Sequence, residues 1–249
     1  MSKKKLARMI LVCIMAISII VGITIFPSCQ SQSPTPPTYG LEFDGVDDYV
    51  ALGNSTALGF TSQDFTIEAW IKLDVTDRGM MIFRRYSWNN DGYRLNTGTG
   101  GNIQFYTFQS GANQLSKSSS GVLVAGNWSH VVVVRQGASV RLWVDGVDAT
   151  TTFGSHIGPA YSASRQTYIG TSYAPEAFNG TISEVRIWNY ARTESEIKAN
   201  MYKELTGSES GLAGYWKLNE GSGTIAHDST ANNNHGTLEG DPVWFTGGS

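Results

Sequence analysis

The chain has 249 residues and a formal net charge of −3 at pH 7, so it lacks the strongly basic character typical of nucleic-acid-binding proteins. Its two cysteines, Cys13 and Cys29, both lie near the N-terminus. This excludes disulfides, thiol catalysis and zinc–thiolate sites from the chain beyond Cys29.

The first 28 residues have the order of a bacterial export signal. Basic residues precede an almost wholly apolar stretch, 9–26, and the small residue Ser28 stands before Cys29. The segment resembles a bacterial lipobox, which predicts cleavage after residue 28 and lipid attachment at Cys29. An uncleaved membrane anchor and soluble secretion are the alternatives, because 18 apolar residues can just span a bilayer.

Residues 29–38 are rich in proline and serine and are predicted to form a stiff, solvated tether. One domain is then expected over residues 39–249. Loss of the four basic residues of the signal leaves 14 Lys and Arg against 21 Asp and Glu, a net charge of −7. We expect a membrane-anchored lipoprotein of the bacterial cell envelope. Gln30 is not acidic, which favours the outer membrane or the cell surface over the inner membrane.

Several segments alternate apolar and polar residues, the pattern of a half-buried strand. Residues 41–52 contain the turn-forming pair Asp44-Gly45 between apolar residues, which predicts a hairpin or a bulged strand. Residues 64–73 form the cleanest strand, with Phe65, Ile67 and Ile71 on a core face and Trp70 on a partly solvated face. Shorter strands are predicted over 80–85, 93–96 and 103–108, and the polar residues 109–120 are predicted to form a loop.

Residues 128–152 predict a three-strand antiparallel meander. Four consecutive valines, 131–134, favour a strand that is covered on both faces. Asp145-Gly146 between apolar flanks indicates a two-residue hairpin, since both central positions of a type I′ turn need positive φ.

The remaining chain adds short strands and one helix. Strands are predicted near 167–170, 181–188, 212–218, 237–238 and 242–245, with a long polar loop over 221–236. Thr193 and Glu196 form a capping box that starts a helix over 193–205, with Gly207 as its stop. The pattern as a whole predicts an all-β, two-sheet antiparallel sandwich of jelly-roll type with one short peripheral helix.

Several sequence blocks in this order resemble the laminin G-like branch of the concanavalin A-like lectin/glucanase jelly rolls. They are L-E-F-D-G-V-D-D-Y-V, F-T-I-E-A-W-I-K, W-S-H-V-V-V-V-R and F-N-G-T-I-S-E-V-R-I-W, followed by G-Y-W-K-L-N-E-G. The resemblance implies binding of carbohydrate or protein at a cell surface. It is specific for the fold and far less so for function.

Hydrolysis is disfavoured by the placement of the acids. A retaining glycosidase needs two carboxyl groups about 5–5.5 Å apart. Glu68 and Glu184 stand alone on their strands, and the adjacent Asp47 and Asp48 would point to opposite faces of an extended chain. We therefore expect no catalytic residues. His130, beside the valine run, is expected to be a hydrogen-bonded structural residue.

Calcium is the candidate cofactor, since the resemblance implies a frequent Ca²⁺ site at the rim of such sandwiches. Calcium takes six to eight oxygen ligands, and we predict Asp44, Asp228, Asn232 and Asn234 as metal ligands, with Asp47 and Asp48 nearby. The alternative is that these residues only form turns, in which they bond their own backbone.

Aromatic and polar side chains crowd the hairpin end near residue 90. Aromatic planes stack on sugar faces, and amide or guanidinium groups bond hydroxyls. The predicted ligand-binding residues are Arg84, Tyr86, Trp88, Asn90 and Tyr93. Tyr106 and Tyr173 are further candidates. The alternative is that Tyr86 and Tyr93 fill the core or an edge and the arginines pair with acids.

Together these patterns predict a non-catalytic, surface-anchored binding module, with a glycan as the first expected ligand. A structural or adhesion protein that binds a protein partner is the second hypothesis, and a glycoside hydrolase is the third.

Overall fold

The structure is a computed structural model that describes residues 35–60, 64–87, 90–109, 112–157, 165–171, 173 and 175–247. The predicted signal, Cys29 and most of the predicted tether lie outside these residues. By its internal contacts the chain divides into residues 1–34 and residues 35–249, and the fold below is that of the second unit. Within the described part, no helix is long and apolar enough to cross a membrane.

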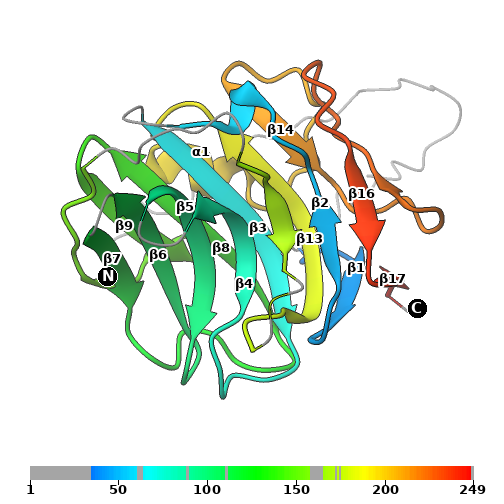
Figure 1. The fold of residues 1–249 in the computed structure, drawn as a ribbon, viewed down its shortest axis with the longest axis horizontal. Coiled ribbons are helices and arrows are strands. Elements are labelled where there is room, and N and C mark those ends of the chain that lie inside the picture. Colours follow the sequence, from blue (N-terminus) through cyan, green and yellow to red (C-terminus); the bar gives the residue numbers. More distant parts are fainter. Residues whose placement is uncertain are drawn as a thin grey trace, which may run out of the picture. The chain divides into compact units, whose positions relative to one another are not determined.

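The described chain is built from two antiparallel sheets (Figure 1). The strands of the first, sheet A, are β1 (Tyr39–Asp44), β3 (Phe65–Leu73), β8 (Trp128–Gln136), β9 (Ser139–Val144), β10 (Val147–Asp148), β13 (Asn179–Trp188), β14 (Leu212–Trp216) and β17 (Val243–Thr246). They run in the order β10-β9-β8-β3-β13-β1-β17, and β14 pairs with β13.

The strands of the second, sheet B, are β2 (Tyr49–Ala51), β4 (Met81–Ser87), β5 (Asp91–Gly98), β6 (Asn102–Gln109), β7 (Ala112–Ser118), β11 (Thr150–Thr152), β12 (Tyr168–Gly170), β15 (Ile225–Ala226) and β16 (Gly236–Glu239). Their order is β11-β7-β6-β5-β4-β12-β2-β16-β15. A 3-10 turn, η1 (Thr56–Leu58), and a helix, α1 (Glu194–Asn200), complete the fold. The predicted two-sheet sandwich with one short helix is confirmed.

The apolar core lies between the sheets and follows the predicted period of two. Ile67, Ala69 and Ile71 of β3 are buried in it, as are Val131 and Val133 of β8. Phe83, Leu95 and Phe105 face them from sheet B. Burial at roughly 25 cal/mol per Å² of apolar surface makes this layer the main stabilising contribution.

The Asp145-Gly146 turn is confirmed, with φ values of 50° and 75°. These are the positive values that a type I′ turn requires. The turn joins β9 to β10, so that Val144 pairs with Val147.

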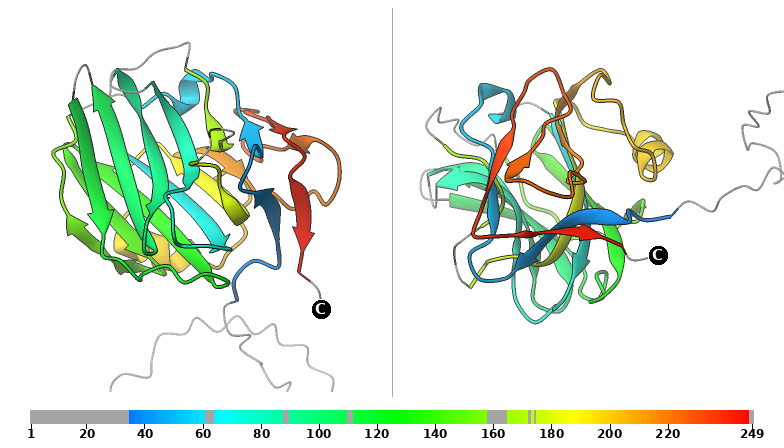
Figure 2. Two further views of the ribbon diagram at one scale, coloured as in Figure 1. Left: turned by 60° about the horizontal axis from the view of Figure 1, so that its bottom comes forward. Right: turned by 90° about the vertical axis from the view of Figure 1, so that its right-hand side faces the viewer.

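The predicted hairpin over residues 41–52 is wrong. β1 pairs with β13 and β17 in sheet A, whereas β2 pairs with β12 and β16 in sheet B. Figure 2 shows the two strands in different layers. A local Asp-Gly signal cannot reveal that both strands find their partners far along the chain.

The loop predicted over 109–120 contains β7, which pairs with β6. Its sequence lacks apolar alternation because two of its inward positions are serines. Ser118 Oγ accepts a hydrogen bond from the Ile103 amide at 3.0 Å, and Ser116 Oγ lies 3.0 Å from His156 Nε2. Satisfied hydroxyl groups replace apolar side chains here.

The outer face of sheet A is covered, although the sequence predicts partial solvation. Ile197 of α1 packs on Val132 and Val134, so the valine strand is covered on both faces as predicted. Helix α1 lies outside the sandwich (Figure 2). Thr193 and Glu196 form the predicted capping box.

The helix ends at Asn200, earlier than predicted, and side chains of sheet A bind carbonyls at this end and just beyond it. Arg186 donates to the Asn200 carbonyl at 3.0 Å and to the Lys203 carbonyl at 2.5 Å. Trp70 Nε1 donates to the Met201 carbonyl at 3.0 Å. These donors satisfy acceptors that have no partner within the helix.

A buried charge cluster lies under this segment. Glu68 Oε1 is 2.5 Å from Arg192, and its Oε2 is 3.3 Å from His130 Nε2 and 3.9 Å from Arg186. Burial alone would raise the pKa of Glu68, but His130 and the two arginines lower it to about 2. His130 is fully buried, but the hydrogen bond expected of its ring is not formed with good geometry among the described residues, where its nearest polar contact is Glu68.

Candidate functional site

The outer face of sheet B carries a row of aromatic and cationic side chains. In register, Tyr168 lies opposite Arg84, Arg84 opposite Arg94, and Arg94 opposite Tyr106. Because alternate residues of a strand share a face, these four side chains lie on the face opposite the core. The row runs across β12, β4, β5 and β6.

A groove opens on this face. Arg84, Tyr86, Tyr173, Pro175 and Glu176 line a hollow of about 600 Å³. Glu176 is held beside β4, since the Met81 amide donates to its carbonyl at 2.8 Å, and the Glu176 amide in turn donates to the Tyr173 carbonyl at 2.8 Å. The Tyr173 side chain is 70% exposed.

Arg84 is the unpaired cation of the groove. Its guanidinium lies 4.2 Å from the centre of the Tyr168 ring. Among the residues that the structure describes, no carboxylate lies within 4.0 Å of it, and its Nε has no hydrogen-bond partner. Burial lowers the pKa of Arg84. The side chain is therefore held in place by stacking and keeps its donors free.

The neighbouring groups of the groove are fixed by one another. Arg94 binds both oxygens of Glu176, at 2.9 and 3.1 Å, and its guanidinium lies 4.5 Å from the Tyr106 ring centre. Tyr86 stacks on the buried Phe108 with ring centres 4.6 Å apart. The arrangement offers flat aromatic surface next to fixed hydrogen-bonding groups.

The structure brings together part of the predicted ligand-binding set. Arg84 and Tyr86 line the groove, and the further candidate Tyr173 joins them. Asn90 lies at the exposed β4–β5 turn, where its amide nitrogen donates to the Ser87 carbonyl at 3.0 Å. Trp88 lies outside the described residues.

Tyr93 is a correction to that set. It is 1% exposed, belongs to the core between the sheets, and donates its hydroxyl to the Leu58 carbonyl at 2.7 Å. Tyr93 faces away from the groove because it alternates with Arg94 along β5. The same alternation could have identified Arg94, whereas no local signal marks Pro175 and Glu176.

The loop that carries the predicted metal ligands Asp228, Asn232 and Asn234 is held in place by hydrogen bonds to Asp228. Asp228, which is 5% exposed, accepts four hydrogen bonds: from the amides of Tyr215, Thr230 and Asn234 and from the Thr230 hydroxyl, at 2.9–3.0 Å. The side-chain amides of Asn232 and Asn234 both donate to the Ala213 carbonyl. Asp228 therefore accepts hydrogen bonds within its own loop, and the two asparagines use their amide nitrogens rather than their oxygens. Their assignment as metal ligands stays a prediction.

The fourth predicted metal ligand, Asp44, lies close to two other aspartates. One carboxylate oxygen each of Asp44, Asp47 and Asp48 lie within 4.8 Å of one another. Asp47 and Asp48 were expected to point to opposite faces only in an extended chain, and that condition is not met because the chain bends between β1 and β2. This cluster lies in the turn, apart from the residues that line the groove.

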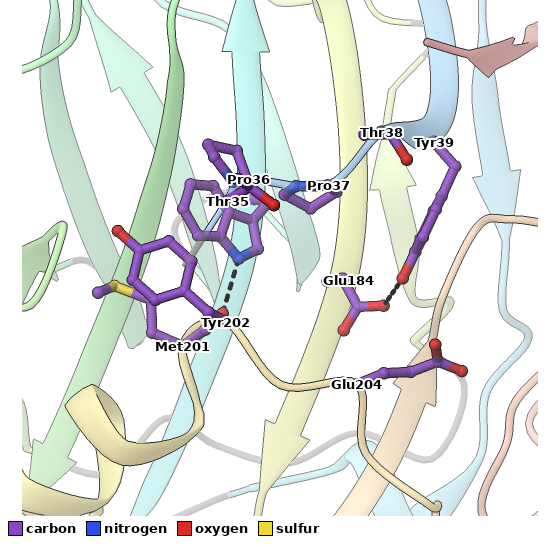
Figure 3. A pocket seen from close by; sticks show the side chains of 10 residues that line it. Thr35, Pro36, Pro37, Thr38, Tyr39, Glu184, Met201, Tyr202 and Glu204 are labelled. Carbon is purple, nitrogen blue, oxygen red and sulfur yellow. Dashed lines mark hydrogen bonds between the residues drawn. The ribbon is translucent and has the colours of Figure 1, made fainter. Parts of the chain in front are cut away.

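A smaller hollow of about 240 Å³ lies where the chain enters β1 (Figure 3). Thr35, Pro36 and Pro37 line it together with Trp70 and Tyr202, so the end of the predicted tether lies against the domain. Its two carboxylates are already paired: Tyr39 donates to Glu184 at 2.7 Å, and Lys217 binds Glu204. The contacts around this hollow hold the start of the domain in place, and its two carboxylates are used in these contacts.

Comparison with known proteins agrees with this architecture. Residues 44–198, more than half of the chain, match a laminin G-like family model described as the concanavalin A-like lectin/glucanases superfamily. The chain belongs to this superfamily. No curated protein sequence matches it.

Solved structures share the fold. A protein of Bacteroides ovatus, described as a candidate carbohydrate-binding protein, is 22% identical with a TM-score of 0.64; the match covers 86% of this chain and 62% of that one. A heptameric SAP-like pentraxin from Limulus polyphemus is 14% identical with a TM-score of 0.57, over 84% of this chain and 94% of the pentraxin. At these identities the likeness concerns the fold alone.

Proposed function

We propose that this protein is a non-catalytic carbohydrate-binding module and that the groove of sheet B holds the glycan. The observation that carries the proposal is Arg84, which has no ion-pair partner in the described chain and lies among aromatic rings in an open hollow. The Bacteroides ovatus protein supports the ligand class, although this chain spans only 62% of its length.

The groups of the groove suit a sugar ring. The exposed face of Tyr173 and the ring of Tyr86 offer apolar planes for the C–H face of a pyranose or furanose. Arg84 contributes donors that have no partner among the described residues, and a guanidinium can bind two oxygens at once. Glu176 is held rigid by Arg94, so binding orders few additional side chains.

The same groove is poorly equipped for hydrolysis. Among its described lining residues, Glu176 is the single carboxylate, and both of its oxygens are bound by Arg94. Retaining and inverting glycosidases alike use two carboxyl groups on either side of the scissile bond. The geometry supports holding a glycan without cutting it.

Titration against a panel of soluble polysaccharides and oligosaccharides tests this function. Arg84→Ala and Tyr173→Ala should each weaken binding by roughly tenfold or more, because a well-placed binding side chain contributes at least about 1.4 kcal/mol. Arg141→Ala is the matched control, since Arg141 is an exposed arginine on sheet A that pairs with Asp148. If all three variants bound the glycan equally well, the groove of sheet B would not be the binding site. Capture of a protein without any glycan binding would favour the adhesion hypothesis.

We also propose that the module is held at the bacterial envelope by a lipid on Cys29. The support is the order of basic, apolar and small residues before this cysteine. Metabolic labelling with a fatty-acid precursor should mark the wild-type chain and not Cys29→Ala, and the variant should leave the membrane fraction. Labelling that persists in Cys29→Ala would refute the lipid anchor.

A further inference from the structure

Arg84 differs from the neighbouring arginines of sheet B in having no acidic partner. Arg94, opposite it in register, binds Glu176 at 2.9 Å, and Arg165 binds Asp91 at 2.7 Å. Arg84 forms no ion pair with any described residue, and its Nε is buried without a hydrogen-bond partner among them. The groove therefore contains a fixed positive charge without a counter-charge.

The surroundings of Arg84 withdraw water from this charge and hold it in place. Its guanidinium lies 4.2 Å from the centre of the Tyr168 ring, and Tyr49 packs edge-on against Tyr168 with ring centres 5.6 Å apart. Burial lowers the pKa of Arg84, because a charged group loses solvation there. Since Nε is enclosed, the terminal nitrogens are the donors that a ligand in the hollow can reach.

The charges around the hollow sum to a positive value. Glu176 is the single carboxylate among the described lining residues, and Arg94 binds both of its oxygens, so the charge of Arg84 remains. The chain beyond the predicted signal is acidic, with 14 Lys and Arg against 21 Asp and Glu. The protein as a whole therefore repels a polyanion, and an anion gains only where it reaches Arg84.

We propose that the groove selects acidic glycans and that Arg84 binds the carboxylate of a uronic acid unit. This rests on the proposed glycan-binding function and names the substrate class of the same groove. A guanidinium offers parallel N–H donors that match the two oxygens of a carboxylate. The carboxylate supplies the missing counter-charge, while Tyr86 and Tyr173 contact the sugar rings.

A neutral sugar would leave the guanidinium without its counter-charge in a site that is already partly dry. Hydrogen bonds to a charged partner contribute more than those between neutral groups. A uronic acid should therefore bind about ten- to hundredfold more tightly than the same sugar with its carboxyl group reduced to an alcohol.

Isothermal titration of the mature chain with matched oligosaccharides tests this preference. The probes are oligomers of galacturonate, glucuronate and mannuronate, each compared with its own carboxyl-reduced, neutral form. At least one acidic oligomer should show the expected preference. A sulfated neutral oligomer is the further arm: tighter binding of the sulfated sugar than of every uronate would overturn the carboxylate assignment.

Three variants separate the charge of Arg84 from the rest of the groove. Arg84→Gln should bring the affinity ratio of acidic to reduced oligomer close to one, with thermal melting to confirm that the variant folds. Tyr173→Ala should weaken both forms alike and leave the ratio unchanged. Arg141→Gln, at an exposed arginine of sheet A, should change neither affinity nor ratio.

The outcomes distinguish this inference from the function on which it rests. Equal binding of acidic and reduced oligomers, with losses in Arg84→Gln and Tyr173→Ala, would overturn the acidic class and keep the glycan groove. A preference that persists in Arg84→Gln would overturn the role of Arg84. If no oligomer in this set or in the neutral panel bound, both the inference and the proposed function would be wrong.

Discussion

Replacing Glu68 by alanine should lower the free energy of unfolding by about 3–5 kcal/mol, the usual effect of removing one partner of a buried charge pair. Glu68 is fully buried and lies 2.5 Å from Arg192, with His130 and Arg186 close by. Without the carboxylate, the two guanidinium groups would share a dry interface under α1. Urea unfolding should show a lower midpoint with an unchanged slope.

The pH dependence gives this prediction a second readout. The pKa of Glu68 falls from an ordinary 4.5 to about 2 in the folded protein. Its stabilising contribution is therefore complete above pH 4.5 and is lost as the pH falls towards 2. The difference between wild type and Glu68→Gln should be largest near pH 7 and shrink in acid.

Glu194→Ala is the matched control for Glu68→Ala, because Glu194 pairs with Lys198 on the exposed face of α1. Surface pairs of this kind contribute about 0.5 kcal/mol or less. Equal losses for Glu68→Ala and Glu194→Ala would contradict a structural role for the buried cluster.

The second large effect is expected at Asp228. Alanine there removes the acceptor of four hydrogen bonds that tie the loop after β14 to that strand. Hydrogen bonds to a charged group contribute about 1.5–3 kcal/mol each but are not additive, so we expect a loss of about 3–4 kcal/mol. The Asn234 carbonyl, which accepts from Trp216 Nε1 at 2.9 Å, should also be released.

Measurements with and without calcium distinguish a hydrogen-bonding role of Asp228 from a role as a metal ligand. The loss in Asp228→Ala should be the same in CaCl₂ and in chelator when each is measured against wild type under the same condition. Ser222→Ala, at an exposed position between β14 and β15, should change stability by less than about 0.5 kcal/mol. A loss in Asp228→Ala that appears only with calcium would instead support a role of Asp228 as a metal ligand.

The sequence predicted those parts of the fold that local physics determines. Alternation placed Ile67 and Ile71 in the core, positive φ was required at Asp145-Gly146, and the capping box started α1 at Thr193. The sequence-based prediction failed where the placement of a strand depends on partners far along the chain. The Asp-Gly pair at the end of β1 lies where the chain crosses from sheet A to sheet B. The inward serines of β7 remove the apolar alternation by which a strand is predicted.

The candidate site shows the same division. Arg84 and Tyr86 could be identified because aromatic and cationic residues cluster near one hairpin. Tyr93 was misassigned because composition does not reveal which face of β5 is inward. Glu176 joins the groove through a segment far along the chain, a contact that local sequence does not encode. Asp228 and Asp44 were grouped by their oxygen content, but the fold uses one for hydrogen bonds and leaves the other in an acidic turn.

The claim that the groove of sheet B binds a glycan is tested most directly by mapping amide chemical-shift changes while an oligosaccharide ligand is titrated into the protein. The account predicts that the largest changes fall on β4, β6 and the 173–176 segment, around Arg84, Tyr86, Tyr106 and Glu176, with the oligosaccharide intact at the end of the titration. Changes centred on the Asp44–Asp48 turn or on α1, or cleavage of the sugar, would contradict it.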